Sequence, residues 1–226
     1  SPGAKPFVPP IIGLEAANNT HVLRSIPDLD GIMANLNDDG VKQAPVIGAG
    51  FIGIEMAENL AKLGLAVTIV EKAPHVLPPL DEEMAQHILL ELEKNNIQVI
   101  TNQSVVEFKE QGRTLVLEDG TTLNSDLNIL SVGVQPENSL AKEAGIKLGL
   151  RGGIVVDDQY RTNVPDIYAV GDAIVVKQQI TGQDALISLA SPANRQGRQV
   201  ADIIAGLESS NRGSIGTAIV RVFEMA

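Results

Sequence analysis

The chain has 226 residues, a formal net charge of −11 and no cysteine. Hydrophobic residues make up 44% and charged residues 20%, which is the composition of a folded globular protein. The acidic balance argues against a nucleic-acid partner, because phosphate contacts require clustered lysine and arginine. The lack of cysteine excludes disulfides, cysteine-ligated zinc and a thiolate nucleophile.

No apolar run approaches the roughly 20 residues that cross a bilayer, and the N-terminus lacks the basic and hydrophobic regions of a signal peptide. We therefore expect a cytoplasmic protein with no membrane partner. Because the sequence begins at Ser1 without an initiator methionine, we interpret it as an internal piece or a processed product of a longer chain.

The N-terminal third predicts a βαβ unit. A short helix is expected over 27–36 and a turn over 37–40, where Asn, Asp and Gly tolerate left-handed backbone. A strand over 44–47, a glycine turn, a helix that ends at Leu63 and a strand over 66–71 follow. The two strands should be parallel. The buried stripe of the helix is predicted to consist of Ile52, Met56, Leu60 and Leu63.

The middle of the chain predicts a helix over 81–94, with acids in its first turn and a buried stripe of Met84, Ile88 and Leu92. A strand over 98–101 follows. Short strands punctuated by the hairpin signal Asp119-Gly120 are expected to form an antiparallel meander. A buried strand over 126–132 then returns to the sheet. The predicted fold class is α/β, with a Rossmann-like parallel sheet and an antiparallel meander.

Beyond Pro136 the predicted elements become shorter. We expect a helix over 140–144, strands over 154–156, 166–170 and 216–225, and a late helix that Gly206 closes. The late helix is predicted to begin at Pro192 behind Ser191 as N-cap. Its predicted stripe consists of Ala193, Val200, Ala201 and Ile204.

The turn from Gly48 to Gly53 lies between a predicted strand and a predicted helix, which is the context of a dinucleotide-binding fingerprint. Gly48 would permit the tight turn, Gly50 would let a pyrophosphate approach the backbone, and Gly53 would allow close packing of helix on strand. The pyrophosphate would bind at the positive N-terminus of the helix. The alternative is a purely structural glycine turn.

Glu71 ends the second strand at about the spacing of the acid that binds the adenosine ribose hydroxyls. A 2′-phosphate would meet its negative charge, so we expect NAD(H) in preference to NADP(H), while the neighbouring Lys72 keeps NADP(H) open. Pro45 is discordant, because proline removes a backbone donor from a central strand. We expect it at the first residue of the strand, where the missing donor costs little.

Two longer motifs narrow the interpretation. One runs from Val46 to Glu55 and contains the glycine turn, and the other runs from Thr162 to Asp172 with the sequence TNVPDIYAVGD. In this order and spacing they resemble the pyridine nucleotide-disulfide oxidoreductase family. The segments 76–81 and 192–198 are most similar to its coenzyme A-disulfide reductase and NADH oxidase branch.

The resemblance implies a flavoenzyme in which NAD(P)H reduces FAD, and electrons then pass through a cysteine centre to a small-molecule disulfide, a persulfide or oxygen. It implies the end of a first FAD-domain segment over 1–10, an NAD(H)-binding domain over 11–138, the C-terminal half of the FAD-binding domain over 139–213 and the start of a dimerisation domain over 214–226. Family members carry another Gly-x-Gly-x-x-Gly and the redox cysteine ahead of these segments. This chain has no cysteine, so the resemblance implies no catalytic residue within it. We expect a homodimeric parent and a fragment that binds NAD(H) weakly, retains little FAD and is inactive.

The resemblance also assigns flavin contacts. Asp172 would hold the ribityl chain, and Gly171 would allow the cofactor to approach. Ala190 and Ala193 would lie beside the flavin ring, where the late helix aims its positive end. The alternatives are an ordinary turn aspartate and simple helix packing.

Further assignments concern the nicotinamide. Phe51 would gate its pocket, and the adjacent Ile52 is also predicted to bind the cofactor. Glu55 would lie near the nicotinamide, and Gly133 would let the backbone pass close to the NAD. Phe51 could instead fill the core, and Glu55 could be a carboxylate that the helix dipole favours.

His21, His75 and His87 lack metal-ligand spacing, so we expect surface histidines and no metal. Two other functional classes stay open. One is a stand-alone NAD-sensing or NAD-binding module without electron transfer. The other is a single-domain dehydrogenase, against which the lack of a His or Lys acid–base motif after the Rossmann unit argues.

Overall fold

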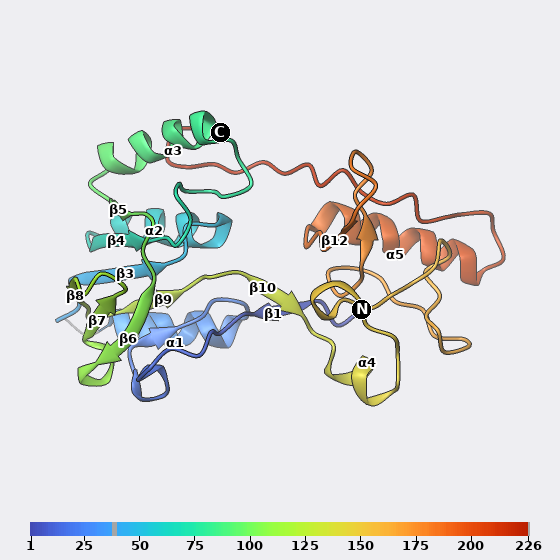
Figure 1. The fold of residues 1–226 in the computed structure, drawn as a ribbon, viewed down its shortest axis with the longest axis horizontal. Helices are drawn as coiled ribbons and strands as arrows, with labels where there is room; N and C mark the ends of the chain where they lie inside the picture. The colour runs from blue at the N-terminus through green and yellow to red at the C-terminus, as the bar shows by residue number, and fades with distance from the viewer. Residues whose placement is uncertain (38–39, 226) are drawn as a thin grey trace. The chain divides into compact units, whose positions relative to one another are not determined.

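The computed structural model describes residues 1–37 and 40–225 (Figure 1). The chain divides into two compact units. The smaller comprises residues 1–5 and 134–218, and the larger comprises residues 6–133 and 219–226. The turn predicted over 37–40 includes residues 38 and 39, which lie outside the described residues.

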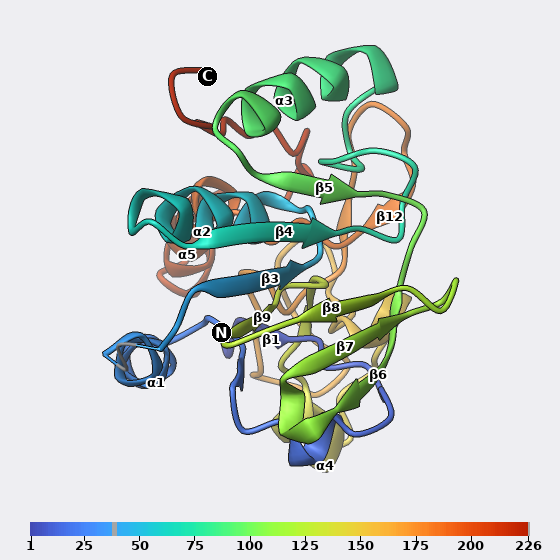
Figure 2. The ribbon, with the colours of Figure 1, turned by 90° about the vertical axis from the view of Figure 1, so that its left-hand side faces the viewer.

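The larger unit is built on a parallel sheet with the strand order β2-β9-β3-β4-β5. Figure 2 shows the part of it from β9 through β3 and β4 to β5. These strands are β2 (Thr20–His21), β9 (Asn128–Leu130), β3 (Gln43–Ile47), β4 (Ala66–Val70) and β5 (Gln98–Ile100). Each neighbouring pair is parallel. The α/β class with a parallel sheet and an antiparallel meander is therefore confirmed.

One face of this sheet packs against helices. They are α1 (Ile26–Leu36), α2 (Phe51–Lys62) and α3 (Glu82–Lys94). One apolar cluster joins them to the strands and includes Ile32, Val46, Ile54, Ile69 and Leu92. Asp81 is the N-cap of α3, and Gly64 follows the C-cap of α2 with φ of 87°. Both boundaries agree with the helix signals in the sequence.

The opposite face packs against the meander β6 (Val105–Lys109), β7 (Thr114–Leu117) and β8 (Thr122–Asn124), which is antiparallel. Ile47, Val70 and Leu130 share a cluster with Phe108 and Leu115. Successive residues of a strand point to opposite faces, so Val46 contacts the helices while Ile47 contacts the meander. Two short 3₁₀ helices, η1 (Leu14–Ala16) and η2 (Glu110–Gly112), complete this side.

The smaller unit contains shorter elements. Strand β1 (Ala4–Pro6) pairs with β10 (Val134–Pro136), and β11 (Val176–Lys177) pairs with β12 (Asp184–Ala185). The helices are α4 (Ser139–Glu143), the 3₁₀ helix η3 (Leu150–Gly152) and α5 (Ala190–Ile204). Their apolar cluster includes Ala141, Ile154, Tyr160, Ala169 and Ile174.

The start of α5 corrects the prediction. The helix begins at Ala190 with Leu189 as N-cap, not at Pro192 behind Ser191. Proline is tolerated at the third position, because the first N–H groups of a helix have no intrahelical partner. The buried residues of α5 are Pro192 and Gln196, whereas the predicted stripe members Ala201 and Ile204 are exposed.

The helix stripes are also corrected in part. Ile52, Leu63 and Met84 are 39%, 64% and 58% exposed, although each was expected to face the sheet. The buried face of α2 instead includes Gly53, Ile54 and Ala57. Small residues let a helix approach a sheet closely, and hydrophobic periodicity gives them little weight.

Three predicted strands are wrong as continuous elements. In the part of the chain that the structure describes, segments 154–156, 166–170 and 216–225 form isolated bridges, at Ile154, Tyr168 and Val222. A run of apolar residues becomes a strand only where a neighbour accepts and donates its backbone hydrogen bonds.

Pro45 is the third residue of β3, so the prediction that it begins the strand is wrong. The Gly48 N–H donates to Val70 O, and the Lys42 carbonyl accepts from the Ala66 N–H. The backbone N–H and C=O groups of the even-numbered residues in β3 therefore point toward β4. The Pro45 nitrogen therefore faces β9. The register with β9 begins only at Val46, which explains why a missing donor is tolerated at Pro45.

Candidate nucleotide-binding site

The glycine turn joins β3 to α2, and its three glycines have three different environments. Gly48 has φ of 104°, and a Cβ there would lie 2.6 Å from the Ser131 carbonyl oxygen. A Cβ on Gly53 would collide with the carbonyl oxygen of Gly48. At Gly50 a Cβ would meet no described atom within 4 Å. Two glycines therefore permit close packing, and the one between them faces open space.

The N-terminus of α2 is free of competing acceptors. Among the described residues, no side chain caps Gly50 and no acid lies in the first turn. By contrast, α1 begins with a capping box formed by Ser25 and Asp28, and α3 carries two glutamates in its first turn. Free N–H groups and an uncompensated dipole favour an anion at the start of α2.

Glu71 follows β4 and lies against the turn. The residue is 9% exposed. Oε2 accepts a hydrogen bond from the Ala49 N–H at 2.6 Å, and Oε1 accepts one from the Ala73 N–H at 2.7 Å. The predicted proximity of turn and acid is therefore present. The neighbouring Lys72 is exposed.

The other predicted nucleotide contacts lie on the surface. Phe51 and Ile52 are 37% and 39% exposed, and Glu55 is exposed on α2. The exposure of Phe51 argues against the alternative that it fills the core. Gly133 has φ of 105°, and a Cβ there would meet no described atom within 4 Å. These positions are open to a ligand.

Sequence reasoning missed two residues that support the turn. The Ser131 hydroxyl lies 3.0 Å from Ile47 O and 3.1 Å from Gly48 O, so it donates to the turn carbonyls. The buried Leu77 donates its N–H to Ala49 O at 2.9 Å. Each contact joins residues far apart in sequence, and only the position of Ser131, two residues before Gly133, hinted at a role.

The predicted flavin residues gather in the smaller unit. Gly171 has φ of 83°, its N–H donates to the buried Gln196 Oε1 at 2.7 Å, and a Cβ on Gly171 would lie 3.9 Å from the Ala193 Cβ. Asp172 is partly buried, and Ala190 is exposed at the first residue of α5. Gly171 and the start of α5 thus lie together.

The start of α5 resembles that of α2. In the described part of the chain it has neither a side-chain cap nor an acid in its first turn. Gln196, which sequence reasoning did not single out, links this helix to Gly171. Asp172 accepts no hydrogen bond from the residues described, so its carboxylate is available to a hydroxyl-bearing ligand.

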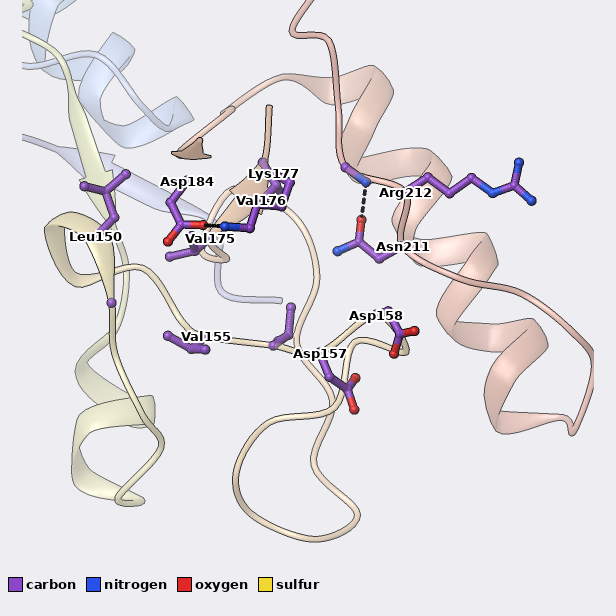
Figure 3. Close-up of a pocket in the computed structure, with 13 residues that line it drawn as sticks. Leu150, Val155, Asp157, Asp158, Val175, Val176, Lys177, Asp184, Asn211 and Arg212 are labelled. Atoms are coloured by element: carbon purple, nitrogen blue, oxygen red, sulfur yellow. Dashed lines mark hydrogen bonds and ion pairs between the residues drawn. The ribbon is translucent and has the colours of Figure 1, made fainter. Parts of the chain in front are cut away.

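A cavity of about 550 Å³ also lies in the smaller unit, beside β11 (Figure 3). Apolar side chains such as Val155 and Val175 line it together with the ion pair of Lys177 and Asp184, whose charged atoms are 2.6 Å apart. None of the predicted cofactor residues is among the described residues that line it. We assign it no role in nucleotide binding.

The histidine prediction is corrected in part. His87 is exposed, but His21 and His75 are half-buried. The His75 Nδ1 lies 2.9 Å from Val76 O, whereas the His21 Nε2 is buried without a hydrogen-bond partner among the described residues. No group of described residues could hold a metal ion. Within residues 1–37 and 40–225, no helix has the length and apolar character needed to span a membrane.

The sequence pattern of pyridine nucleotide-disulphide oxidoreductases matches residues 1–197. The chain belongs to this family. The chain is 36% identical over 225 residues to an NADH oxidase of Methanocaldococcus jannaschii, and this match covers 99% of the chain and 50% of the relative. It is 33% identical over 206 residues to a coenzyme A disulfide reductase of Staphylococcus aureus, with 91% of the chain and 47% of the relative covered. It spans about half the length of both relatives.

Solved structures support the assignment of the chain to this family. Reduced CoADR-RHD from Bacillus anthracis matches with a TM-score of 0.96 and 46% identity, over 98% of the chain and 40% of that protein. An NAD-dependent persulfide reductase from A. fulgidus matches with a TM-score of 0.93 and 35% identity, over 98% of the chain and 41% of that protein. The resemblance inferred from the motifs is therefore confirmed.

Proposed function

We propose that this chain is the NAD(H)-binding portion, with part of the FAD-binding domain, of an oxidoreductase that passes electrons from NADH through FAD to a disulfide, persulfide or oxygen acceptor. The observation that carries the proposal is the turn at Gly48–Gly53, with open space at Gly50 ahead of an uncapped helix. The names of the relatives support the three classes of acceptor.

The residues of the larger unit fit a dinucleotide. Backbone N–H groups at the start of α2 would donate to the pyrophosphate, and the open side of Gly50 would admit it. Phe51, Ile52, Glu55 and Gly133 would contact the nicotinamide half from the exposed surface. Each oxygen of Glu71 accepts one backbone N–H and keeps a lone pair for a ribose hydroxyl.

The proposed preference for NADH over NADPH follows from charge. Glu71 has no ion-pair partner among the described residues, so a 2′-phosphate at this position would face an uncompensated carboxylate. Lys72 is exposed and could approach such a phosphate. We propose that Glu71, whose carboxylate is held by two backbone N–H groups, outweighs Lys72.

The residues of the smaller unit fit a flavin. FAD would accept a hydride from NADH and release electrons to the acceptor. Asp172 would accept a hydrogen bond from the ribityl chain, Gly171 would let that chain approach, and the free start of α5 beside Ala190 and Ala193 would stabilise negative charge on the flavin ring. Because the chain has no cysteine, we propose that it does not reduce a disulfide by itself.

The decisive test is direct binding. NADH fluorescence titrated with the 226-residue chain should saturate, and Gly50→Ala should weaken NADH binding about tenfold or more with an unchanged melting temperature. Gly197→Ala is the matched control, since a Cβ there also meets no described atom within 4 Å but lies on α5. Equal NADH affinity of the Gly50→Ala variant would contradict the site.

The longer parent protein tests the electron transfer. Its absorbance spectrum should show flavin bands that bleach when NADH is added and recover with a disulfide, persulfide or oxygen. A colourless parent that still binds NADH would favour a stand-alone NAD-binding module. The dimeric state and the cytoplasmic location of the parent stay predictions.

A further inference from the structure

Ala49, in the middle of the nucleotide turn, has both of its backbone hydrogen-bonding groups occupied from one segment. Its N–H donates to Glu71 Oε2 at 2.6 Å, and its carbonyl accepts from the Leu77 N–H at 2.9 Å. The Ala49 side chain is fully buried. The turn is therefore held from outside, by the residues that follow β4.

Glu71 is itself fixed on several sides. Its second carboxylate oxygen accepts from Ala73 N–H at 2.7 Å. Its backbone N–H donates to Ile100 O at 2.8 Å, and its carbonyl accepts from Gln103 N–H at 3.1 Å. A carboxylate held at both oxygens, on a backbone held at both sides, has little freedom to move toward a ligand.

The far end of the segment is anchored in the core. Val76 and Leu77 are 1% and 0% exposed and belong to the cluster that joins the helices to the sheet. Leu77 has φ of 46°, a backbone conformation that leucine rarely adopts. Such a conformation persists only where the surroundings enforce it. The bond from Leu77 to Ala49 therefore starts from a rigid point.

We propose that Glu71 is a positioning residue that holds the glycine turn in its nucleotide-binding conformation before the ligand arrives, in addition to any contact with ribose. This inference rests on the proposed nucleotide site. Its consequence concerns specificity. Because Glu71 shapes the turn that binds the pyrophosphate common to NADH and NADPH, its loss weakens the binding of both nucleotides. For NADPH, the relief of repulsion at the 2′-phosphate offsets only part of this loss. Neutralising Glu71 alone does not convert the site to NADPH.

The competing view is that Glu71 acts only through its charge and its contact with ribose. Under that view a neutral residue removes the repulsion of the 2′-phosphate, so NADPH affinity rises while NADH affinity falls. The ligand-free turn would be unaffected. The two views thus differ in the sign of the NADPH change.

Glu71→Gln in the full 226-residue chain tests the proposal. NADH and NADPH affinities are measured by fluorescence titration, and hydrogen exchange at the Ala49 amide is measured without nucleotide. We expect NADH affinity to fall about tenfold or more, NADPH affinity to fall by a smaller factor, and Ala49 exchange to speed up about tenfold, as for a lost hydrogen bond to a charged group. A rise in NADPH affinity, or unchanged Ala49 exchange, would overturn the proposal.

Glu71→Asp is the second variant. It keeps the negative charge but is one methylene shorter, so it cannot reach both Ala49 and Ala73. The proposal expects weaker binding of NADH and NADPH with their ratio preserved, and unchanged NADH affinity would overturn it. Lys72→Gln is the matched control, since it alters an adjacent exposed charge and should leave Ala49 exchange unchanged.

The readouts also separate this proposal from the proposed function. If the unaltered chain bound neither NADH nor NADPH, the proposed function would fail. The Ala49 exchange rate would still report whether Glu71 holds the turn, because that measurement uses no nucleotide. Fast exchange in both Glu71 variants with slow exchange in Lys72→Gln would support the positioning role on its own.

Discussion

The carboxylate of Glu58 on α2 accepts a hydrogen bond at 2.9 Å from the backbone N–H of Phe223, 165 residues further along the chain. Glu58 is buried and pairs with Lys62 one turn later on α2, and the Lys62 ammonium lies 5.7 Å from the centroid of the Phe223 ring. Val222 and Phe223 are buried in the helix-facing cluster. Val222 and Phe223 are therefore part of the core that supports the nucleotide-binding helix.

Replacing Glu58 should destabilise the larger unit. Glu58→Ala leaves the Phe223 N–H without its acceptor in a buried setting and Lys62 without its partner, so we expect a loss of about 2 kcal/mol in the free energy of unfolding. Urea unfolding measures the loss. Hydrogen exchange at the Phe223 amide should quicken in parallel. Glu55→Ala, which alters an exposed residue of the same helix, should change stability by less than about 0.5 kcal/mol.

Glu58 should also make stability depend on pH. Burial raises the pKa of the Glu58 carboxyl, but the hydrogen bonds from Lys62 and from the Phe223 N–H outweigh burial and lower the pKa below the ordinary 4.5. The stabilisation is therefore complete above about pH 4.5 and is lost as the pH falls through the lower pKa of the folded state. Unfolding curves between pH 7 and pH 3, at about one-unit steps, should show this loss. The Glu58→Gln variant should lack this pH-dependent part of the unfolding free energy. If the variant and the unaltered chain had the same pH profile, Glu58 would not be its source.

Gly53→Ala should damage the fold more than the binding surface. A Cβ at Gly53 would collide with the Gly48 carbonyl oxygen and lie 2.7 Å from the Ser131 hydroxyl. Because a backbone carbonyl cannot move aside cheaply, we expect a cost of about 2 kcal/mol or more, seen as a lower melting temperature. Gly50→Ala, with open space around its Cβ, is the matched variant and should melt like the unaltered chain. Equal melting temperatures for the two variants would contradict this packing.

Gln196→Leu should loosen the predicted flavin site. Among the described residues, Gln196 is the only acceptor for the buried Gly171 N–H, and its removal costs about 1–3 kcal/mol locally. Hydrogen exchange at Gly171 should speed up accordingly. Gln196→Glu keeps an acceptor oxygen at this position and should exchange more slowly than Gln196→Leu. If both variants exchanged like the unaltered chain, Gln196 would not hold Gly171.

Much of the fold and of the candidate site could be predicted from the sequence, because the residues that determine these features are close together in the chain. Glycines at 48, 50 and 53 between a strand and a helix predicted the turn, and a hairpin signal at Gly120 predicted the bend between β7 and β8, where the Leu117 N–H donates to Thr121 O. The βαβ order, the meander and the acid at position 71 follow from neighbouring residues, whose conformational preferences do not depend on distant contacts.

Only the tertiary structure decided which residues support those motifs. Ser131, Leu77 and Gln196 act through hydrogen bonds to residues far away in sequence, and local preference carries no information about such partners. The buried face of α2 was misjudged for the same reason, since Gly53 and Ala57 are buried by close approach to the sheet and not by hydrophobicity. Glu71 shows the division most clearly: the sequence placed an acid beside the turn, but only packing revealed that its oxygens already hold Ala49 and Ala73.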